Sequence, residues 1–329
     1  MEKGEGENET YITQFILLGF GNHAELQPLL FLLFLVIYIV TMAGNILIIA
    51  LVVTDQHLHT PMYFFLGNLS CLETSFTSTI LPRVLDSLLT GDRNISVTGC
   101  ITQFYFLGLY VGVECYLLAL MSYDRYLAIC KPLHYPGLMN GRICQQLAAV
   151  SWMSGFMIIT IVTCLMSQLH FCGPNEINHF LCDFTPVIKL SCSDTSLIIL
   201  VTFIFSSIYT LPLFLLTLAS YICIISTILR IPSTTGRRKA FSTCSSHLIV
   251  VTIYYGTLII VYMFPVTDTL RDLNKVFSLF YTVLTPLANP LIYSLRNKEV
   301  KAALRKVISK CMELHWSSKF LFVIHVVMK

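Results

Sequence analysis

An acid and a base stand side by side where a long apolar stretch of the chain ends. Asp124, Arg125 and Tyr126 close an apolar run that begins near residue 99. An ionisable side chain inside the hydrocarbon of a bilayer costs roughly 2.5 to 3.5 kcal/mol, so both charges are expected at a helix end, paired with each other or with a neighbour. Because such a pair can be broken and remade, it predicts either an anchor at the membrane interface or a switch.

Two carboxylates lie in the middle of apolar stretches, where charge is rare and usually functional. They are Glu73 and Glu114, and Asn45 and Asn289 lie in two further apolar segments. Carboxylate and amide oxygens together could bind Na⁺, so the four residues form a candidate metal site. Two protonated glutamic acids bonded to their neighbours explain the same residues, because burial favours the neutral form of a carboxyl group. The sequence leaves both interpretations open and predicts no other cofactor.

Four of the twelve cysteines fall in segments that we expect on the oxidising side of the membrane: Cys100, Cys172, Cys182 and Cys192. Four cysteines allow three disulfide connectivities. A link from the segment 167–196 to Cys100 would fold that segment over the helices as a lid. A metal site that combines His170 and His179 with two of these cysteines is the alternative, although the spacings match no common zinc pattern.

Seven apolar segments must position these residues, and each has about the 20 residues that a helix needs to cross a bilayer. They cover residues 27–53, 62–86, 99–129, 144–166, 197–229, 241–263 and 274–295. With 55% hydrophobic residues, 12% charged residues and a mean hydropathy of +0.74, the chain has too much apolar surface for a soluble domain. Because backbone groups in lipid must be satisfied within the segment, the sequence predicts an all-α, seven-transmembrane helix bundle over residues 27–295.

The positive charges predict how this bundle is oriented. Fifteen of the 21 Lys and Arg residues fall on the side of the C-terminus, which is therefore expected in the cytosol. Residues 1–26 form an expected extracellular tail, and its first ten residues are polar and acidic, without the basic and apolar regions of a cleavable signal peptide. Glycosylation sequons at Asn8 and Asn94 fall on this outer side. We expect a multi-pass protein of the plasma membrane.

The end of the seventh segment combines two prolines with a tyrosine. Pro286 and Pro290 leave backbone carbonyls without their helical partners. A bend there would carry Tyr293 toward Tyr221 and Arg125, whereas a static kink is the structural alternative.

The chain continues beyond the seventh segment with a basic stretch. Residues 296–311 are amphipathic as well as basic, so we expect a short cytosolic helix on the anionic inner leaflet. Residues 312–329 are expected to be a cytosolic tail.

The outer halves of three segments carry apolar and aromatic residues that could wall a small cavity. The expected lining is Phe104, Leu107, Gly108, Val111, Phe205, Ser206, Tyr209, Tyr255, Leu258, Ile259 and Tyr262. Aromatic residues at helical spacing are usually packing. The cavity is inferred because Gly108 and Gly112 should leave unfilled volume where their helix faces inward.

Three motifs of this chain resemble those of the odorant receptors, a branch of the rhodopsin-like G-protein-coupled receptors. They are Met-Ser-Tyr-Asp-Arg-Tyr at 121–126, Lys-Ala-Phe-Ser-Thr-Cys-Ser-Ser-His-Leu at 239–248 and Pro-Leu-Ala-Asn-Pro-Leu-Ile-Tyr-Ser-Leu-Arg-Asn at 286–297. The resemblance covers about residues 10–310 and includes Gly44-Asn45 and the segment 61–66. Glu73 is a departure, because the family more often has aspartate there.

The resemblance implies a receptor without enzymatic activity, in which Arg125 locks the resting state and contacts a G protein when released. The implied switch residues are Asp124, Arg125, Tyr126, Tyr221 and Tyr293, and the implied disulfides are Cys100–Cys182 and Cys172–Cys192. The implied partners are a small volatile odorant, a stimulatory olfactory-type G protein that raises cyclic AMP, and membrane lipid. Nucleic acid is not expected.

Other functions fit the residues less well. A transporter would show paired repeats with broken helices, and the chain has no internal repeat. An intramembrane hydrolase would need a motif such as HExxH or GxSxG, and neither is present. A non-olfactory rhodopsin-like receptor for a small metabolite remains the alternative.

Overall fold

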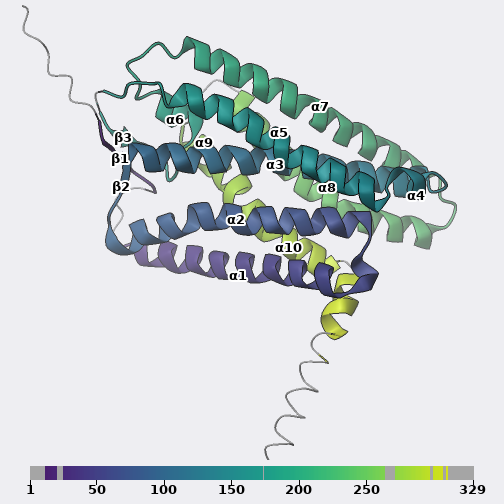
Figure 1. Ribbon diagram of the computed structural model, residues 1–329. Helices are drawn as coiled ribbons and strands as arrows, with labels where there is room; N and C mark the ends of the chain where they lie inside the picture. Colours follow the sequence, from purple (N-terminus) through teal and green to yellow (C-terminus); the bar gives the residue numbers. More distant parts are fainter. Residues whose placement is uncertain are drawn as a thin grey trace, which may run out of the picture.

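The computed structural model describes residues 12–20, 25–172, 174–263, 271–296, 299–306 and 309. Its long helices are α1 (Gln27–Thr54), α2 (Pro61–Thr90), α3 (Val97–Cys130), α5 (Gly141–Met166), α7 (Ser196–Leu229) and α8 (Thr234–Met263), as Figure 1 shows. Shorter helices lie between them: η1 (Gln56–Leu58), α4 (Tyr135–Leu138) and α6 (Phe184–Ile188). The predicted all-α class is confirmed.

The segment 274–295 was expected as one helix, and the structure divides it into three consecutive elements. They are α9 (Arg271–Leu279), the π-helix η3 (Phe280–Leu284) and α10 (Thr285–Arg296). Pro290 lies inside α10, and its Cβ is 2.9 Å from the position that a Cβ on Gly44 of α1 would take. A glycine is therefore needed where α1 passes the proline ring.

Four helices of the described chain are long and apolar enough to cross a membrane: α1, α3, α5 and α7. The count of seven crossings and the boundaries at 27–295 and 296–311 remain predictions. Residues 299–306 are helical, with Val300 and Ala303 buried and Lys301 and Arg305 exposed. The tail 312–329 lies outside the described residues.

Local signals set several helix ends. Pro61 begins α2, where a missing N–H does no harm. Gly91, with φ of 75°, ends the same helix in the left-handed conformation that favours glycine. The hydroxyl of Ser96 accepts a hydrogen bond from the Gly99 amide at 3.0 Å and caps α3, and Asn140 caps α5 in the same way.

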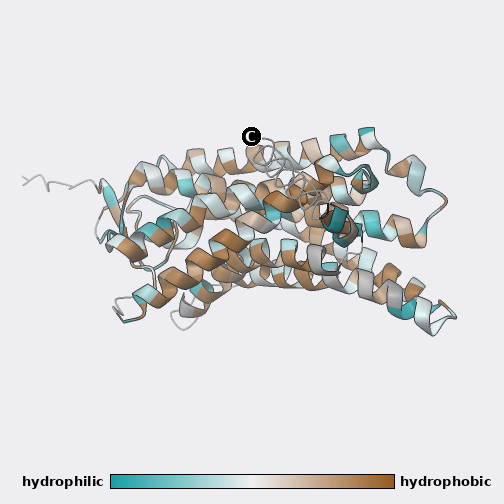
Figure 2. Cartoon of the chain, turned by 90° about the horizontal axis from the view of Figure 1, so that it is seen from below, coloured by the Kyte–Doolittle hydropathy of each residue, from teal (hydrophilic) through white to brown (hydrophobic). Residues whose placement is uncertain are grey.

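α3 lies at the centre of the bundle, between the layer of α1 and α2 and the layer of α5, α7 and α8 (Figure 1). Buried side chains occur along most of its length, from Cys100 to Leu127. By contrast, α1 and α7 expose large apolar residues such as Leu29 at 63% and Ile208 at 69%. Figure 2 shows hydrophobic residues along the middle of the helices, with more polar residues near their ends. Apolar surface of this extent is compatible with lipid as the surrounding solvent.

A small sheet that the sequence did not predict joins the N-terminal segment to two loops. β1 (Gln14–Leu17) lies between β2 (Asn94–Ser96) and β3 (Glu176–Ile177). β1 is antiparallel to β2, with Phe15 opposite Ile95, and parallel to β3, with Leu17 opposite Ile177. The sheet fixes the N-terminal segment at the same end of the bundle as the segment 167–196.

Candidate functional site

A cavity of about 130 Å³ lies between α3, α5, α7 and α8, beneath α6. Ten of the eleven expected lining residues lie on its wall: Phe104, Leu107, Gly108, Val111, Phe205, Ser206, Tyr209, Leu258, Ile259 and Tyr262. Tyr255 does not line it. That side chain is fully buried, and its hydroxyl donates to the carbonyl oxygen of Cys115 at 2.7 Å. Tyr255 therefore joins α8 to α3 behind the wall, because its hydroxyl needs an acceptor inside the bundle.

The sequence interpretation missed one whole side of the cavity. The unpredicted lining residues come from α5, from the lid segment and from α7: Gly155, Ile158, Ile159, Val162, Asp183, Phe184, Thr202 and Thr210, together with Cys115 of α3. Gly112, from which the cavity was inferred, also lines it. Hydropathy marks α5 as apolar without indicating which face turns inward. For Asp183 the sequence offered one signal: it follows Cys182, which was expected to be linked to Cys100 and so to bring its neighbour close to the cavity.

Gly108 of α3 serves a different purpose from the one expected, whereas Gly112 does not. A Cβ on Gly108 would collide with the terminal methyl of Ile159 and come within 3.0 Å of its Cγ1. The volume beside Gly108 is therefore filled by a side chain of α5 and is not empty. A Cβ on Gly112 would instead meet Tyr209 Cε1 at 3.6 Å, which is an ordinary contact. The inference of free volume was wrong for Gly108, because the glycine lets α5 pack closely.

Two disulfides hold the lid segment over the cavity. Cys100 at the start of α3 is bonded to Cys182, and Cys172 is bonded to Cys192. The amide of Cys182 also donates to Oε1 of Gln103 at 2.9 Å. Both expected disulfides are present, so these cysteines are not metal ligands. The described residues contain no group of three His, Cys, Asp or Glu side chains that could hold a metal ion.

The carboxyl group of Asp183 connects the lid to two helical elements. It accepts hydrogen bonds from the Phe184 amide at 2.7 Å, from the hydroxyl of Tyr262 at 3.1 Å and from the hydroxyl of Tyr281 at 3.2 Å. Burial raises the pKa of Asp183, although its three donors act in the opposite direction. The same lid contains His179, which is buried and accepts a hydrogen bond from the Leu181 amide. Burial and, to a smaller extent, the charge of Lys275 lower the pKa of His179 to about 3.

At the other end of α3, Asp124 is paired with a neighbour and not with Arg125. The hydroxyl of Tyr135 in α4 donates to Oδ1 of Asp124 at 2.8 Å, and Asp124 is buried. Arg125 is half-buried and lies close enough to Tyr221 and His247 to interact with them electrostatically. The anchoring contact at this helix end is therefore the hydrogen bond between Tyr135 and Asp124, and the charge of Arg125 acts on these two residues as well as on Tyr221 and His247.

Tyr221 and His247 connect α7 and α8 at the end of the bundle opposite the lid. The hydroxyl of Tyr221 is hydrogen-bonded to Nδ1 of His247, and the two rings are stacked. Tyr126 packs against the apolar cluster that Tyr221 forms with Ile224, Ile228 and Cys244. The side chain of Tyr293 lies outside the described part of the chain. His247 was not among the predicted switch residues, although it belongs to the motif at 239–248.

The four residues of the candidate sodium site lie near one another inside the bundle. Nδ2 of Asn289 donates to Oε1 of Glu73, and Nδ2 of Asn45 donates to the Pro286 carbonyl at 3.2 Å. Among the described residues, the buried oxygens without a hydrogen-bond partner include Glu73 Oε2, both oxygens of Glu114, Asn45 Oδ1 and Asn289 Oδ1. Buried oxygens without donors fit a hard cation. If Glu73 and Glu114 were protonated instead, their own O–H groups would donate to some of these oxygens.

The two expected glycosylation sites differ in what the structure describes. Asn94 is exposed in β2, and Nδ2 of its side chain donates to Oδ1 of Asp92 at 3.0 Å. Asn8 lies outside the described residues. A third tripeptide match at Asn68 lies within α2, where the side chain accepts a hydrogen bond from Trp152 at 3.4 Å. Asn68 is therefore a packing residue.

Comparison with known proteins gives a consistent result. A family model described as olfactory receptor matches residues 34–311. Mouse olfactory receptor 5AP2 is 49% identical over 304 residues, which cover 92% of this chain and 96% of the relative. Human olfactory receptor 11L1 is 50% identical over 321 residues, with 97% and 100% covered. Human olfactory receptor 10A4 is 50% identical over 307 residues, with 93% and 98% covered.

Proposed function

The chain belongs to the olfactory receptor family, whose members are receptors and not enzymes. From this premise we propose that it binds a small volatile odorant. We propose further that the bound receptor activates a stimulatory olfactory-type G protein, which raises cyclic AMP. The observation that carries the proposal is the apolar cavity of about 130 Å³ beneath the disulfide-held lid. Residues in the C-terminal half of α8 line the cavity, and the N-terminal half of α8 extends to the opposite end of the bundle.

The cavity limits the size of the ligand. An apolar protein cavity of about 150 Å³ is large enough for benzene, so a cavity of about 130 Å³ suits a ligand of similar bulk. Its wall is largely apolar, but Oγ1 of Thr202 is buried without a hydrogen-bond partner. A ligand with one polar atom could satisfy that group. Because most contacts would be dispersion contacts, we expect micromolar affinity or weaker, about 8 kcal/mol at most.

The coupling between the two ends is proposed to run through α8. Leu258, Ile259 and Tyr262 line the cavity, while Cys244 and His247 of the same helix contact the inner end of α7. A ligand that favours one position of the outer half of α8 also favours one position of its inner end. When the contact between Tyr221 and His247 opens, Arg125 would become available to the G protein.

The proposed arrangement in the membrane follows the charges. We propose seven crossings in the plasma membrane, an extracellular N-terminus and a cytosolic C-terminus, with lipid around α1 and α7. Glu73, Glu114, Asn45 and Asn289 would hold Na⁺ between α1, α2, α3 and α10. The bound ion would supply a positive charge that holds these helices in one arrangement.

A cyclic AMP assay tests the proposal. Cells that contain the olfactory G protein and this receptor would be screened with a panel of volatiles, and with water-soluble metabolites for the alternative function. We expect volatiles to raise cyclic AMP and Arg125→Ala to abolish the response. Arg142→Ala is the matched control, because Arg142 is exposed at the start of α5 near the same end of the bundle. A full response of Arg125→Ala at equal surface expression would refute the proposed mechanism.

A further inference from the structure

A second cavity, which we call the vestibule, lies between the lid segment, α8 and α9. Its volume is about 210 Å³, whereas that of the odorant cavity is about 130 Å³. Its lining includes the exposed residues Glu176, Asn178 and Lys189 and the buried residues His179 and Asp183, so the vestibule leads from the surface into the bundle. By volume, it is large enough for any molecule that the odorant cavity can hold.

The vestibule and the odorant cavity adjoin at Asp183, which among the described residues is the only one that lines both. The residues beside this point divide between the two spaces. On the lid, Phe184 lines the odorant cavity and Thr185 lines the vestibule. On α8, Tyr262 lines the odorant cavity and Val261 lines the vestibule. The side chains around Asp183 therefore form the partition between the two cavities.

Two hydrogen bonds between side chains hold this partition closed. The hydroxyl of Tyr262 donates to Oδ1 of Asp183 at 3.1 Å, and the hydroxyl of Tyr281 donates to Oδ2 at 3.2 Å. The two hydroxyl oxygens are 3.2 Å apart, but an ionised carboxylate that takes both hydroxyl protons leaves none for this contact. The three side chains come from the lid, α8 and η3. Because neither hydrogen bond belongs to a helix backbone, both can break while the helices stay folded.

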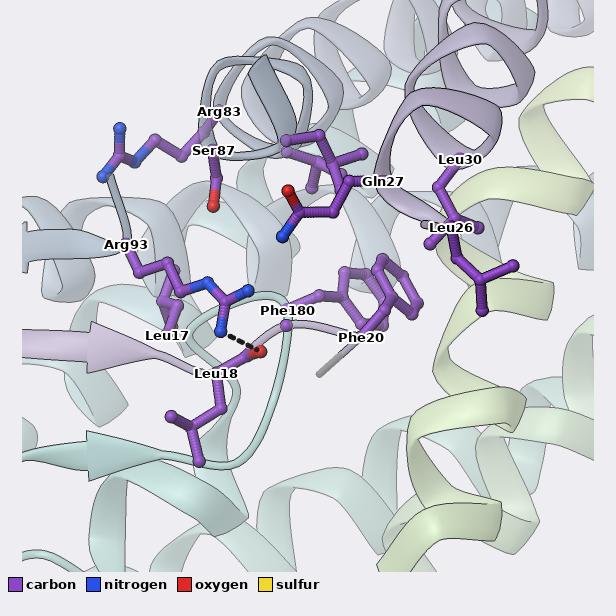
Figure 3. Close-up of a pocket in the computed structure, with 13 residues that line it drawn as sticks. Leu17, Leu18, Phe20, Leu26, Gln27, Leu30, Arg83, Ser87, Arg93 and Phe180 are labelled. Atoms are coloured by element: carbon purple, nitrogen blue, oxygen red, sulfur yellow. Dashed lines mark hydrogen bonds between the residues drawn. The ribbon is translucent and has the colours of Figure 1, made fainter. Parts of the chain in front are cut away.

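The lid backbone next to Asp183 is held in place by other contacts. Cys182 is bonded to Cys100 of α3. The ring of Phe180 is stacked on that of Phe20 from the N-terminal segment, with centroids 5.3 Å apart (Figure 3). A small cavity of about 40 Å³ beside these rings shares no lining residue with the vestibule or the odorant cavity, so it does not connect them. Opening of the partition therefore depends on the two tyrosines and not on movement of the whole lid.

Tyr281 lies where the helix geometry changes. It belongs to the π-helix η3 (Phe280–Leu284), which joins α9 to α10. Single π-helical turns within α-helices are rare and occur frequently at functional sites. Tyr281 is fully buried, but it does not line the odorant cavity. Its hydroxyl can therefore be removed without a change in the wall of the ligand site.

We propose that the vestibule is the entry site for the ligand, and that the hydrogen bonds from Tyr262 and Tyr281 to Asp183 form the gate between the vestibule and the odorant cavity. The ligand is a small neutral molecule that arrives from water, because the vestibule is lined by an exposed base, Lys189, as well as an exposed acid, Glu176. The bond from Tyr281 controls the rates of entry and exit and not the affinity. The identity of the ligand as an odorant rests on the proposed function, whereas the path itself does not.

The test measures how fast a thiol inside the odorant cavity is modified in the full chain in phosphatidylcholine nanodiscs. Ser206→Cys places a thiol on the cavity wall, and the probe is methyl methanethiosulfonate, a small neutral reagent. The thiolate attacks the reagent, forms a methyl disulfide and releases methanesulfinate. Mass spectrometry measures the modification at position 206 and, in the same sample, at Cys164 of α5 and Cys223 of α7. These two cysteines are exposed, so they react without passing the gate.

Two variants change the path at different points. Tyr281→Phe removes one of the two hydrogen bonds of the gate, so modification at position 206 should become about tenfold faster. Asn274→Trp puts a large side chain into the vestibule, so modification at position 206 should become at least about tenfold slower. Val276→Trp is the matched control, because Val276 is 49% exposed on the same helix and does not line the vestibule. The rates at Cys164 and Cys223 should stay unchanged in all three variants.

Three outcomes would overturn the proposal. The first is that Asn274→Trp slows modification at position 206 no more than Val276→Trp does, because the reagent would then enter from the lipid between the helices. The second is that folded Tyr281→Phe leaves the rate at position 206 unchanged. The third is that Tyr281→Phe accelerates all three positions equally, which would indicate general loosening. Because Tyr281→Phe could fail to fold, the pair of tryptophan variants gives an independent result. The measurement uses no odorant or G protein, so its failure is distinct from failure of the proposed function.

Discussion

Gly108 and Gly112 lie one turn apart on α3, and a methyl group at each should have a different effect. At Gly112 the new Cβ would lie 3.6 Å from Tyr209 Cε1 and 3.9 Å from the Cα of Gly155, so nothing needs to move. The methyl group would reduce a cavity of about 130 Å³. A ligand that loses contact worth one methylene loses about 0.8 kcal/mol, or roughly fourfold in potency. A ligand that already fills the cavity should lose roughly 10- to 200-fold.

At Gly108 the methyl group would instead displace Ile159, whose Cγ1 lies 3.0 Å from the built position. Forcing extra volume into packed side chains costs typically about 1 to 3 kcal/mol. Gly108→Ala should therefore lower surface expression and thermal stability as well as potency. Ile159→Val removes the colliding terminal methyl, so the double variant should regain part of the lost stability.

The assay compares dose–response curves for ligands of increasing size with surface expression measured in the same cells. Gly137→Ala is the control, because a Cβ there has no neighbour within 4 Å. The reasoning would be refuted if Gly112→Ala left the potency of every active ligand unchanged. It would equally be refuted if Gly112→Ala lowered expression as much as Gly108→Ala.

Three further predictions concern polar groups. Tyr135→Phe removes the hydrogen bond to Asp124, so the unfolding free energy should fall by roughly 1.5 to 3 kcal/mol. The control Tyr123→Phe should change the unfolding free energy little. Equal unfolding midpoints for the two variants would contradict the prediction. Glu73→Gln should abolish any sodium dependence of agonist potency, and a wild-type potency that ignores sodium counts against the cation site. The pKa of His179 falls from 6.5 to about 3 on folding, so below pH 6.5 the unfolded chain binds a proton that the folded chain does not bind. The contribution of His179 to folding stability is therefore complete above pH 6.5 and is lost as the pH falls. Between pH 7 and pH 5, wild type should lose about 2 kcal/mol more stability than His179→Gln, measured by thermal unfolding.

Much of the helical framework could be predicted because the length and hydropathy of a segment are local properties. The first expected segment, 27–53, differs by one residue from α1 (Gln27–Thr54), and 197–229 differs by one residue from α7 (Ser196–Leu229). The apolar segments and the helices differ most where a helix extends beyond its apolar residues. α8 begins at Thr234, seven residues before the apolar run, because a helix can continue through charged residues outside the hydrocarbon. Strands as short as β3 leave no readable period in a sequence.

The candidate site was predictable on α3 and poorly predictable elsewhere. The motif around Asp124 and Arg125 locates the C-terminal end of α3, but the sequence cannot show that Asp124 accepts a hydrogen bond from Tyr135. Nor does it show that Ile159 occupies the space beside Gly108. Both facts depend on the distance and rotation between two helices. Those quantities result from packing many side chains at once, and no single segment contains them.

The sequence by itself therefore determined the class of protein, the positions of its main helices and the family to which it belongs. Each follows from residues that are close together in the chain. The tertiary structure decided which faces of the helices meet, and so the cavity wall from α5, the position of Tyr255 behind that wall and the convergence of Asp183, Tyr262 and Tyr281. The physical reason is that burial and hydrogen bonding of a side chain are set by neighbours that lie far from it in sequence.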